Sequence, residues 1–221
     1  MIPIAAGVLA APLIASLNTV FPSATFSVAV GSTDQLVEAM LKGSVDVAVI
    51  NPVPDDRVFY RELLTENLVL VGGRESGLEP SRETTFADLV ELPLVIPRSP
   101  TGVGNALENA ALRTKVAIGY RTATDSLQVA KSLIEAGLAY AVLPLSAVGR
   151  ELEDGRMRHS PIAEPSLSQQ LGVAATAQLD LPREYAAKVG DTLREETARL
   201  IKSGRWPAQL LSKERWNPSF A

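Results

Sequence analysis

Residues 122–144, TATDSLQVAKSLIEAGLAYAVLP, decide the fold of this chain. The stretch has the pattern of a polar cap, an amphipathic helix, a glycine stop and a buried strand. Asp125 and Gln128 have the spacing of a capping box, so the helix is predicted to begin near Ser126. Gly137 supplies the residue on which the helix ends. The apolar positions that recur at helical spacing are Leu127, Ala130, Leu133 and Ile134.

A strand is predicted over residues 138–143, and Pro144 closes it. The run is apolar without alternation, which favours a strand of a parallel sheet covered by helices on both faces. The polar residues Thr124, Asp125 and Ser126 lie at the helix start, where free N–H groups attract an anionic or carbonyl-bearing ligand. Capping alone also explains these three residues, and both interpretations stay open.

Composition indicates an ordinary folded protein. The chain has 221 residues, 46% of them hydrophobic and 21% charged, which suffices for one large domain or two small lobes. We expect two lobes. The sequence has no cysteine, which excludes disulfides and thiolate sites, and its one histidine, His159, lies in a stretch predicted to be a loop. We therefore expect no metal, no cofactor and no histidine-dependent catalysis.

The net charge and the N-terminal sequence further limit the class of protein. The net charge of −4, without a concentrated basic stripe, argues against direct DNA binding by these residues. The apolar N-terminus lacks the basic start of a signal peptide, and Pro3, Pro12 and Asn18 are expected to interrupt a membrane span. We expect a soluble, cytoplasmic chain without membrane contact.

The first lobe is predicted to begin with a helix that Pro22 stops, followed by a half-exposed edge strand over residues 25–30. Ser32 and Gln35 are spaced as a capping box for the next helix, which Gly43 ends. A buried strand over residues 45–50 then leads into a rigid loop. Ligands bind at such strand ends in open α/β sheets.

The second lobe repeats this pattern. After a strand at 67–71, Gly72 and Gly73 are read as a hinge. A short helix is expected at 86–92. Ser99 followed by Pro100 has the arrangement of a helix start after a strand at 93–97. A further strand is expected at 116–121.

Beyond Pro144 the polar segment up to residue 165 is read as a loop. A strand over residues 171–177 is expected to return the chain to the first lobe, and a long helix to cover about 183–202. The remaining tail, with Trp206 and Trp216, has no functional interpretation.

With these residues placed, the chain resembles the effector-binding domain of LysR-type transcriptional regulators. No single motif is decisive, but their order and spacing over about residues 2–195 are specific for the family. The matching signatures are Phe21-Pro22, Val30-Gly31 with Leu36 and Leu41, residues 43–48 (GSVDVA), residues 66–71 (ENLVLV), Asp88-Leu89, residues 93–97 (PLVIP) and residues 135–144 (EAGLAYAVLP).

The resemblance implies an α/β fold of two Rossmann-like lobes joined by two crossover strands, similar to type 2 periplasmic-binding proteins. The first lobe would comprise residues 1–72 and 171–221, and the second residues 73–170. The family's domain opens with a strand before the segment that matches Ile2-Pro3, so we expect part of the first lobe's sheet to be missing here. The family binds DNA through an N-terminal helix-turn-helix, which these residues do not include.

By the same resemblance, a small polar or anionic effector binds in the cleft between the lobes, at loops that open helices. Arg98 is a candidate counter-ion, and Ser99 and Thr101 are the strongest candidates for direct contact. The implied effector-binding residues are Ile2, Pro3, Ser32, Thr33, Asn51, Pro52, Val53, Arg98, Ser99, Pro100, Thr101, Gly102, Thr124, Asp125 and Ser126.

The resulting hypothesis is the regulatory domain of a transcription regulator that assembles as a homodimer or tetramer. The alternative is a solute-binding protein of a transporter, which shares the same plan but is disfavoured by the missing signal sequence. An enzyme is the least favoured class, because the polar candidates lack a histidine or cysteine to activate them.

Overall fold

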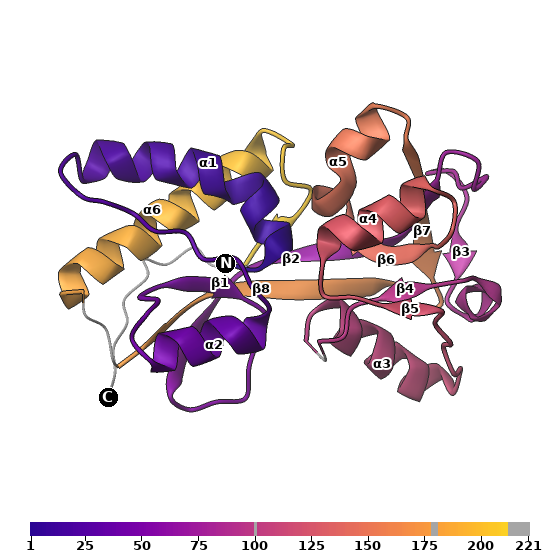
Figure 1. Ribbon diagram of the computed structural model, residues 1–221, viewed down its shortest axis with the longest axis horizontal. Helices are drawn as coiled ribbons and strands as arrows, with labels where there is room; N and C mark the ends of the chain where they lie inside the picture. Colours follow the sequence, from indigo (N-terminus) through magenta and orange to yellow (C-terminus); the bar gives the residue numbers. More distant parts are fainter. Residues whose placement is uncertain (100, 178–180, 212–221) are drawn as a thin grey trace. The chain divides into compact units, whose positions relative to one another are not determined.

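The computed structural model describes residues 1–99, 101–177 and 181–211. These form two compact units (Figure 1), each with its own hydrophobic core. Unit 1 holds residues 1–65 and the described residues from 170 onward, and unit 2 holds residues 66–169. The chain passes between the units twice, in strands β2 (Val58–Gly73) and β8 (Leu167–Thr176). Each unit is described below by itself.

Unit 1 begins with helix α1 (Pro3–Val20), which continues through Pro12, so the expected interruption by prolines is wrong. By length and composition α1 is the one helix in the described residues that could cross a membrane. Its residues Ala5, Leu9, Leu13 and Leu17 are nevertheless buried in the core of unit 1, where α1 packs against α6 (Arg183–Lys202). One face of α1 therefore packs into the core of unit 1.

The segment between α1 and α2 (Thr33–Leu41) contains no strand, which corrects the predicted edge strand at 25–30. A strand requires a neighbouring segment to pair with. Among the described residues, the backbone groups of 25–30 have almost no such partner. The capping box is confirmed, since the Ser32 hydroxyl accepts from Gln35 N and the Gln35 side chain accepts from Ser32 N.

The sheet of unit 1 is short at its first strand. Strand β1 spans only Ala48–Ile50 and pairs antiparallel with β8, with Val49 opposite Val173. The first half of β2 pairs with β9 (Gln209–Leu210). Trp206, from the part of the tail that the structure describes, is fully buried in the unit 1 core, whereas Trp216 lies outside the described residues.

Unit 2 is organised around the second half of β2, whose residues 69–71 pair antiparallel with β6 (Ala141–Pro144) and with β7 (Met157–Ala163). The expected parallel pairing of β6 to its main neighbour is therefore wrong. The predicted loop beyond Pro144 is also wrong, because it holds helix α5 (Leu145–Glu153) and β7. His159 lies in β7, where partial burial lowers the pKa of its imidazole.

The predicted hinge at Gly72 and Gly73 is also wrong, since both residues lie inside β2. A side-chain carbon at Gly73 would stand 2.6 Å from the carbonyl oxygen of Ile134, at the end of helix α4 (Leu127–Glu135). Glycine is present here because a helix backbone approaches the strand closely.

The remaining elements of unit 2 are short strands, one helix turn and one longer helix. Strand β3 (Thr84–Thr85) pairs parallel with β7, and a 3-10 helix, η1, spans Ala87–Glu91. Strands β4 (Val95–Ile96) and β5 (Thr122–Ala123) pair parallel, and helix α3 (Val103–Thr114) connects them on one side. The strand expected at 116–121 is wrong, because these residues form no strand and β5 follows them.

Candidate functional site

The predicted site residues fall into two clusters, one in each unit. In unit 2, strands β4 and β5 run parallel, so their carboxyl ends lie at the same edge of this two-stranded sheet. The loop after β4 leads into α3, and the loop after β5 leads into α4. The two helix starts therefore follow neighbouring strand ends, the usual place for a ligand in open α/β sheets.

A hydrogen bond joins the two loops of unit 2. The backbone N–H of Arg98 donates to Asp125 Oδ1 at 3.0 Å, and Arg98 Nε lies 3.8 Å from Asp125 Oδ2. Both side chains are largely exposed, 72% and 53% respectively, so this ion pair is weak. Asp125 is therefore an inter-loop acceptor, and its predicted role as the cap of α4 is wrong.

The cap of α4 is Ser126. Its hydroxyl accepts from Val129 N, and Thr124 Oγ1 in turn accepts from Ser126 N. Helix α4 then ends as predicted, with Gly137 in the left-handed region.

Helix α3 has a different start. Its N-cap is Gly102, which offers no side-chain oxygen, so the predicted cap at Ser99 is wrong. Ser99 Oγ instead bonds to Thr101 Oγ1 at 2.8 Å and accepts from Thr101 N at 3.4 Å. Pro100, also predicted to contact the effector, lies outside the described residues. Among the described residues the backbone N–H groups of Val103 and Asn105 have no hydrogen-bond partner.

The geometry of this loop depends on glycine. Gly102 has φ 56° and ψ −119°, a conformation that residues with a side chain rarely adopt. A Cβ at Gly104 would stand 2.4 Å from the carbonyl oxygen of Ser99. The loop can therefore fold back tightly, with the Ser99 carbonyl oxygen against the first turn of α3.

The cluster of unit 1 is more buried. Thr33 is 1% exposed and Asn51 is 5% exposed, and they are joined by bonds of Asn51 N to Thr33 Oγ1 and of Thr33 Oγ1 to Asn51 Oδ1, each 3.3 Å. Asn51 Nδ2 donates to the carbonyl oxygen of Gln170, at the start of the returning chain. This third partner was not predictable, because nothing in the sequence links residues 51 and 170.

The other predicted residues of unit 1 lie around this pair. Ile2 is buried, and its backbone N–H donates to the carbonyl oxygen of Val49. Pro3 is the first residue of α1, and Pro52 and Val53 follow β1. That the two clusters bind one effector stays a prediction.

Two α/β units with helix starts at strand ends define a ligand-binding class of protein. Comparison with known proteins gives the family: residues 1–198 match the family described as the LysR substrate binding domain. The chain belongs to this family. The predicted class of fold is confirmed, because structural neighbours are LysR regulatory domains, which have the type 2 periplasmic-binding-protein fold.

Individual relatives are distant. The chain is 25% identical over 173 residues to the HTH-type transcriptional regulator BbuR of Bordetella bronchiseptica, covering 78% of this chain and 53% of BbuR. The chain thus spans about half the length of that relative.

The fold is also similar to solved structures. The regulatory domain of Synechocystis PCC6803 CcmR in complex with 2-PG has a TM-score of 0.76 at 19% identity, covering 88% of this chain and 93% of that one. The effector-binding domain of QuiR in complex with shikimate has a TM-score of 0.74 at 14% identity, covering 91% and 94%.

Proposed function

We propose that this chain is the effector-sensing domain of a bacterial transcription regulator, which acts on DNA through a separate helix-turn-helix domain. Family membership and the regulators among its relatives support this proposal over a transporter's solute-binding protein. The described residues hold no group of three or more His, Cys, Asp or Glu side chains that could bind a metal ion. In this proposal the protein is cytoplasmic, assembles as a homodimer or tetramer and performs no catalysis.

The observation that carries the ligand assignment is the uncapped start of α3. Ser32 and Ser126 each accept one N–H at the starts of α2 and α4, from Gln35 and Val129, whereas the start of α3 has no side-chain cap, and its Val103 N and Asn105 N have no partner among the described residues. Free N–H groups at the positive end of a helix bind anions and carbonyl oxygens. The Ser99 and Thr101 hydroxyls lie in the loop that leads into α3 and can turn from each other toward a ligand.

We infer that the effector is a small carboxylate or phosphate. Such a ligand would accept from the α3 start and from Ser99 and Thr101, with Arg98 as an exposed counter-ion. Two structural neighbours were solved with 2-PG and with shikimate, which supports a small polar ligand for the fold. In the same proposal, Thr33, Asn51 and their neighbours in unit 1 supply the other contacts.

A thermal-shift screen of small carboxylates and phosphates, with shikimate among them, tests the proposal. A ligand at 100 times its Kd stabilises the fold by about 2.7 kcal/mol, a readily measured shift. Thr101→Val and Ser99→Ala are then compared with the parent chain by calorimetry.

We expect each variant to weaken binding by about 1.5–3 kcal/mol, tenfold or more, with the Tm of the ligand-free protein unchanged. Neither hydroxyl caps α3, so a loss of helix stability is not expected. Asn109→Ala, on the exposed face of α3 one turn further along, is the matched control and keeps full affinity. Unchanged affinity in both hydroxyl variants would contradict this placement of the site.

A further inference from the structure

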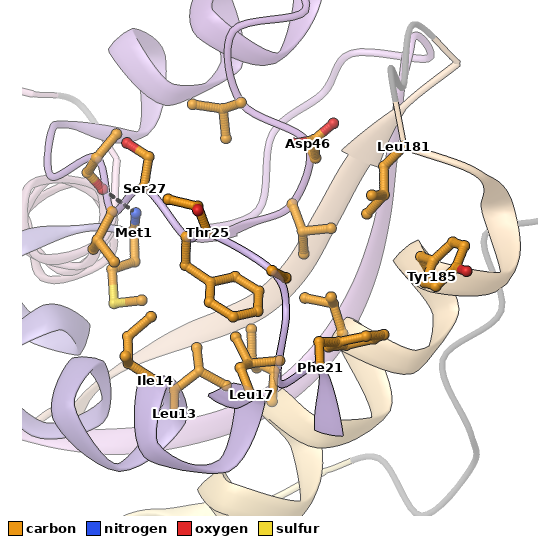
Figure 2. A pocket seen from close by; sticks show the side chains of 18 of the residues that line it. Met1, Leu13, Ile14, Leu17, Phe21, Thr25, Ser27, Asp46, Leu181 and Tyr185 are labelled. Carbon is orange, nitrogen blue, oxygen red and sulfur yellow. Dashed lines mark hydrogen bonds between the residues drawn. The ribbon is translucent and has the colours of Figure 1, made fainter. Parts of the chain in front are cut away.

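The interior of unit 1 is largely apolar. Figure 2 shows a cavity of about 550 Å³ there, and Leu13, Leu17 and Phe21 are among the residues that line it. In apolar surroundings a buried polar side chain is costly unless it is hydrogen-bonded. Four polar residues, two from each unit, are nevertheless no more than 5% exposed: Thr33, Asn51, Glu66 and Gln169. All four belong to one continuous path of hydrogen bonds and covalent bonds.

The first half of the path lies in unit 1. Thr33 is the first residue of α2, and its hydroxyl is bonded to Asn51 at 3.3 Å. Asn51 Nδ2 donates to the carbonyl oxygen of Gln170 at 3.0 Å. Gln170 lies in β8, which pairs with β1 just before Asn51. The position of the Asn51 amide therefore depends on β8 at residue 170.

The second half lies in unit 2 and centres on Glu66 in β2. Glu66 Oε1 accepts from Gln169 Nε2 at 2.7 Å, and Glu66 Oε2 accepts from Ser146 Oγ at 2.7 Å. Ser146 is the second residue of α5, whose N-cap, Pro144, has no side-chain group that could cap the helix. A carboxylate is favourable near the positive start of a helix. Glu66 is thus anchored to α5 as well as to β8.

The two halves meet at the peptide bond between Gln169 and Gln170. Glu66 holds the side chain of the first residue, and Asn51 is held by the backbone carbonyl of the second. Release of the Gln169 side chain frees the β8 backbone one residue away from the carbonyl that Asn51 uses. The geometry at Asn51 therefore responds to the hydrogen bonds of Glu66.

Packing alone does not account for a carboxylate at residue 66. Leu64 and Leu68 share its face of β2 by strand alternation, and both are buried. An apolar side chain at residue 66 would fill the same space without the cost of removing a carboxylate from water. A carboxylate supplies what an apolar side chain does not, namely two acceptors that fix Gln169 and Ser146 together.

We propose that Glu66 is a positioning residue, which fixes the Asn51 amide through Gln169 and β8. It thereby couples the polar cluster of unit 1 to the start of α5 in unit 2. The coupling is a property of the ligand-free protein. That an effector uses it rests on the proposed function, in which Thr33 and Asn51 contact the ligand. By linkage, a ligand that changes the free energy of the Asn51 arrangement changes that of the α5 start by the same amount.

Glu66→Gln tests the path with little change in side-chain shape. The amide has one oxygen in place of two, so it cannot accept from Gln169 and Ser146 in the present geometry. We expect the side-chain NH₂ resonances of Asn51 to shift in the NMR spectrum of ¹⁵N-labelled protein. We also expect exchange of the Asn51 backbone amide to accelerate at least about tenfold. Each rate is divided by that of the buried Leu200 amide in α6, which removes changes in global stability.

Ser160→Ala is the matched control. Ser160 is 1% exposed in β7 of unit 2, and its hydroxyl bonds to Thr84 and to the carbonyl oxygen of Arg82. The substitution removes buried hydrogen bonds from unit 2 without touching β8. We expect the Asn51 resonances and its exchange ratio to stay within about twofold of the parent protein.

An exchange of side chains separates the hydrogen bond from packing. In the double variant Glu66→Gln/Gln169→Glu, the amide at 66 can donate to the carboxylate at 169 and still accept from Ser146. We expect this variant to restore the Asn51 resonances and to bring the exchange ratio within about threefold of the parent protein. A merely structural role for Glu66 would not produce this recovery.

A double-mutant cycle measures the coupling as an equilibrium quantity. Asn51→Ala and Glu66→Gln are made singly and together, and each protein is unfolded in denaturant. Residues without a shared partner have effects that usually add within about twofold in the unfolding equilibrium constant. We expect a departure of at least about threefold for this pair. The cycle of Asn51→Ala with Ser160→Ala is expected to be additive.

Ser146→Ala is a milder variant that keeps the path testable if Glu66→Gln does not fold. It removes one donor to Glu66 and leaves the carboxylate in place. We expect the same shift of the Asn51 resonances and an exchange ratio raised at least about threefold.

Unchanged Asn51 resonances and exchange in Glu66→Gln and Ser146→Ala would overturn the proposal. Additive effects in the Asn51–Glu66 cycle, equal effects of Glu66→Gln and Ser160→Ala on Asn51, or a side-chain exchange that restores nothing would also overturn it. No ligand takes part in these measurements. A negative result therefore leaves the proposed effector site standing, and a failed effector screen leaves the coupling standing.

Discussion

The two predicted ligand clusters differ in how completely their polar atoms are used. In unit 1, Thr33 and Asn51 are buried, and they are bonded to each other and to the Gln170 carbonyl. In unit 2, Ser99 and Thr101 are half-buried, and their hydroxyls bond only to their own loop. The first cluster stabilises the fold, whereas the second retains hydroxyl groups that can form hydrogen bonds to a ligand.

Asn51→Ala is expected to have the largest effect on stability. The substitution removes the bond to the Gln170 carbonyl and leaves Thr33 short of a partner inside unit 1, at a cost of about 2–3 kcal/mol. Denaturant unfolding measures this loss. Asn105→Ala, which removes an exposed amide that bonds only to Asn109, is the control and should change stability by less than about 0.5 kcal/mol. Equal losses in both would show that the unit 1 cluster is not structural.

The serines at the two loops give a smaller contrast. Ser32→Ala breaks the capping box of α2 and should destabilise the protein by about 1 kcal/mol. Ser99→Ala removes a hydroxyl that caps no helix and should cost less than about 0.5 kcal/mol without ligand. The same unfolding measurement compares them. A larger loss for Ser99→Ala would assign its hydroxyl a structural role and weaken its place in the effector site.

The smallest effect is expected for Asp125→Asn. Asparagine keeps an oxygen that can accept from Arg98 N, and the lost ion pair is exposed, so stability should change by less than about 0.5 kcal/mol. Removal of a negative charge beside the α3 start should raise affinity for a carboxylate or phosphate, measured by calorimetry. A fall in affinity would indicate that Asp125 contacts the ligand directly, as a hydrogen-bond acceptor.

Features set by a few neighbouring residues could be predicted from the sequence. The Ser32–Gln35 capping box, the left-handed Gly137 and the span of α6 all depend on local spacing, and the structure confirms them. The family resemblance likewise placed the overall fold correctly. Local signals suffice where hydrogen bonds close within one turn of helix.

Features that depend on a distant partner could not be predicted in the same way. Residues 25–30 and 116–121 have strand-like composition, but a strand exists only where another segment pairs with it. Asp125 appeared to cap α4 until the structure placed the Arg98 N–H beside it. Strand β7 was missed although Met157, Ser160 and Ile162 are buried in it, because its charged flanks resemble a loop.

The double passage of the chain between the units has a consequence for synthesis. Unit 2 is one uninterrupted stretch, residues 66–169, whereas unit 1 is made of the beginning and the end of the chain. Domains generally fold as units while the chain is made from its N-terminus. Unit 2 can therefore complete its core on the ribosome, while the first 65 residues wait for β8 and α6 to emerge. During that interval α1 has no α6 against which to pack, and its apolar face is open to chaperones.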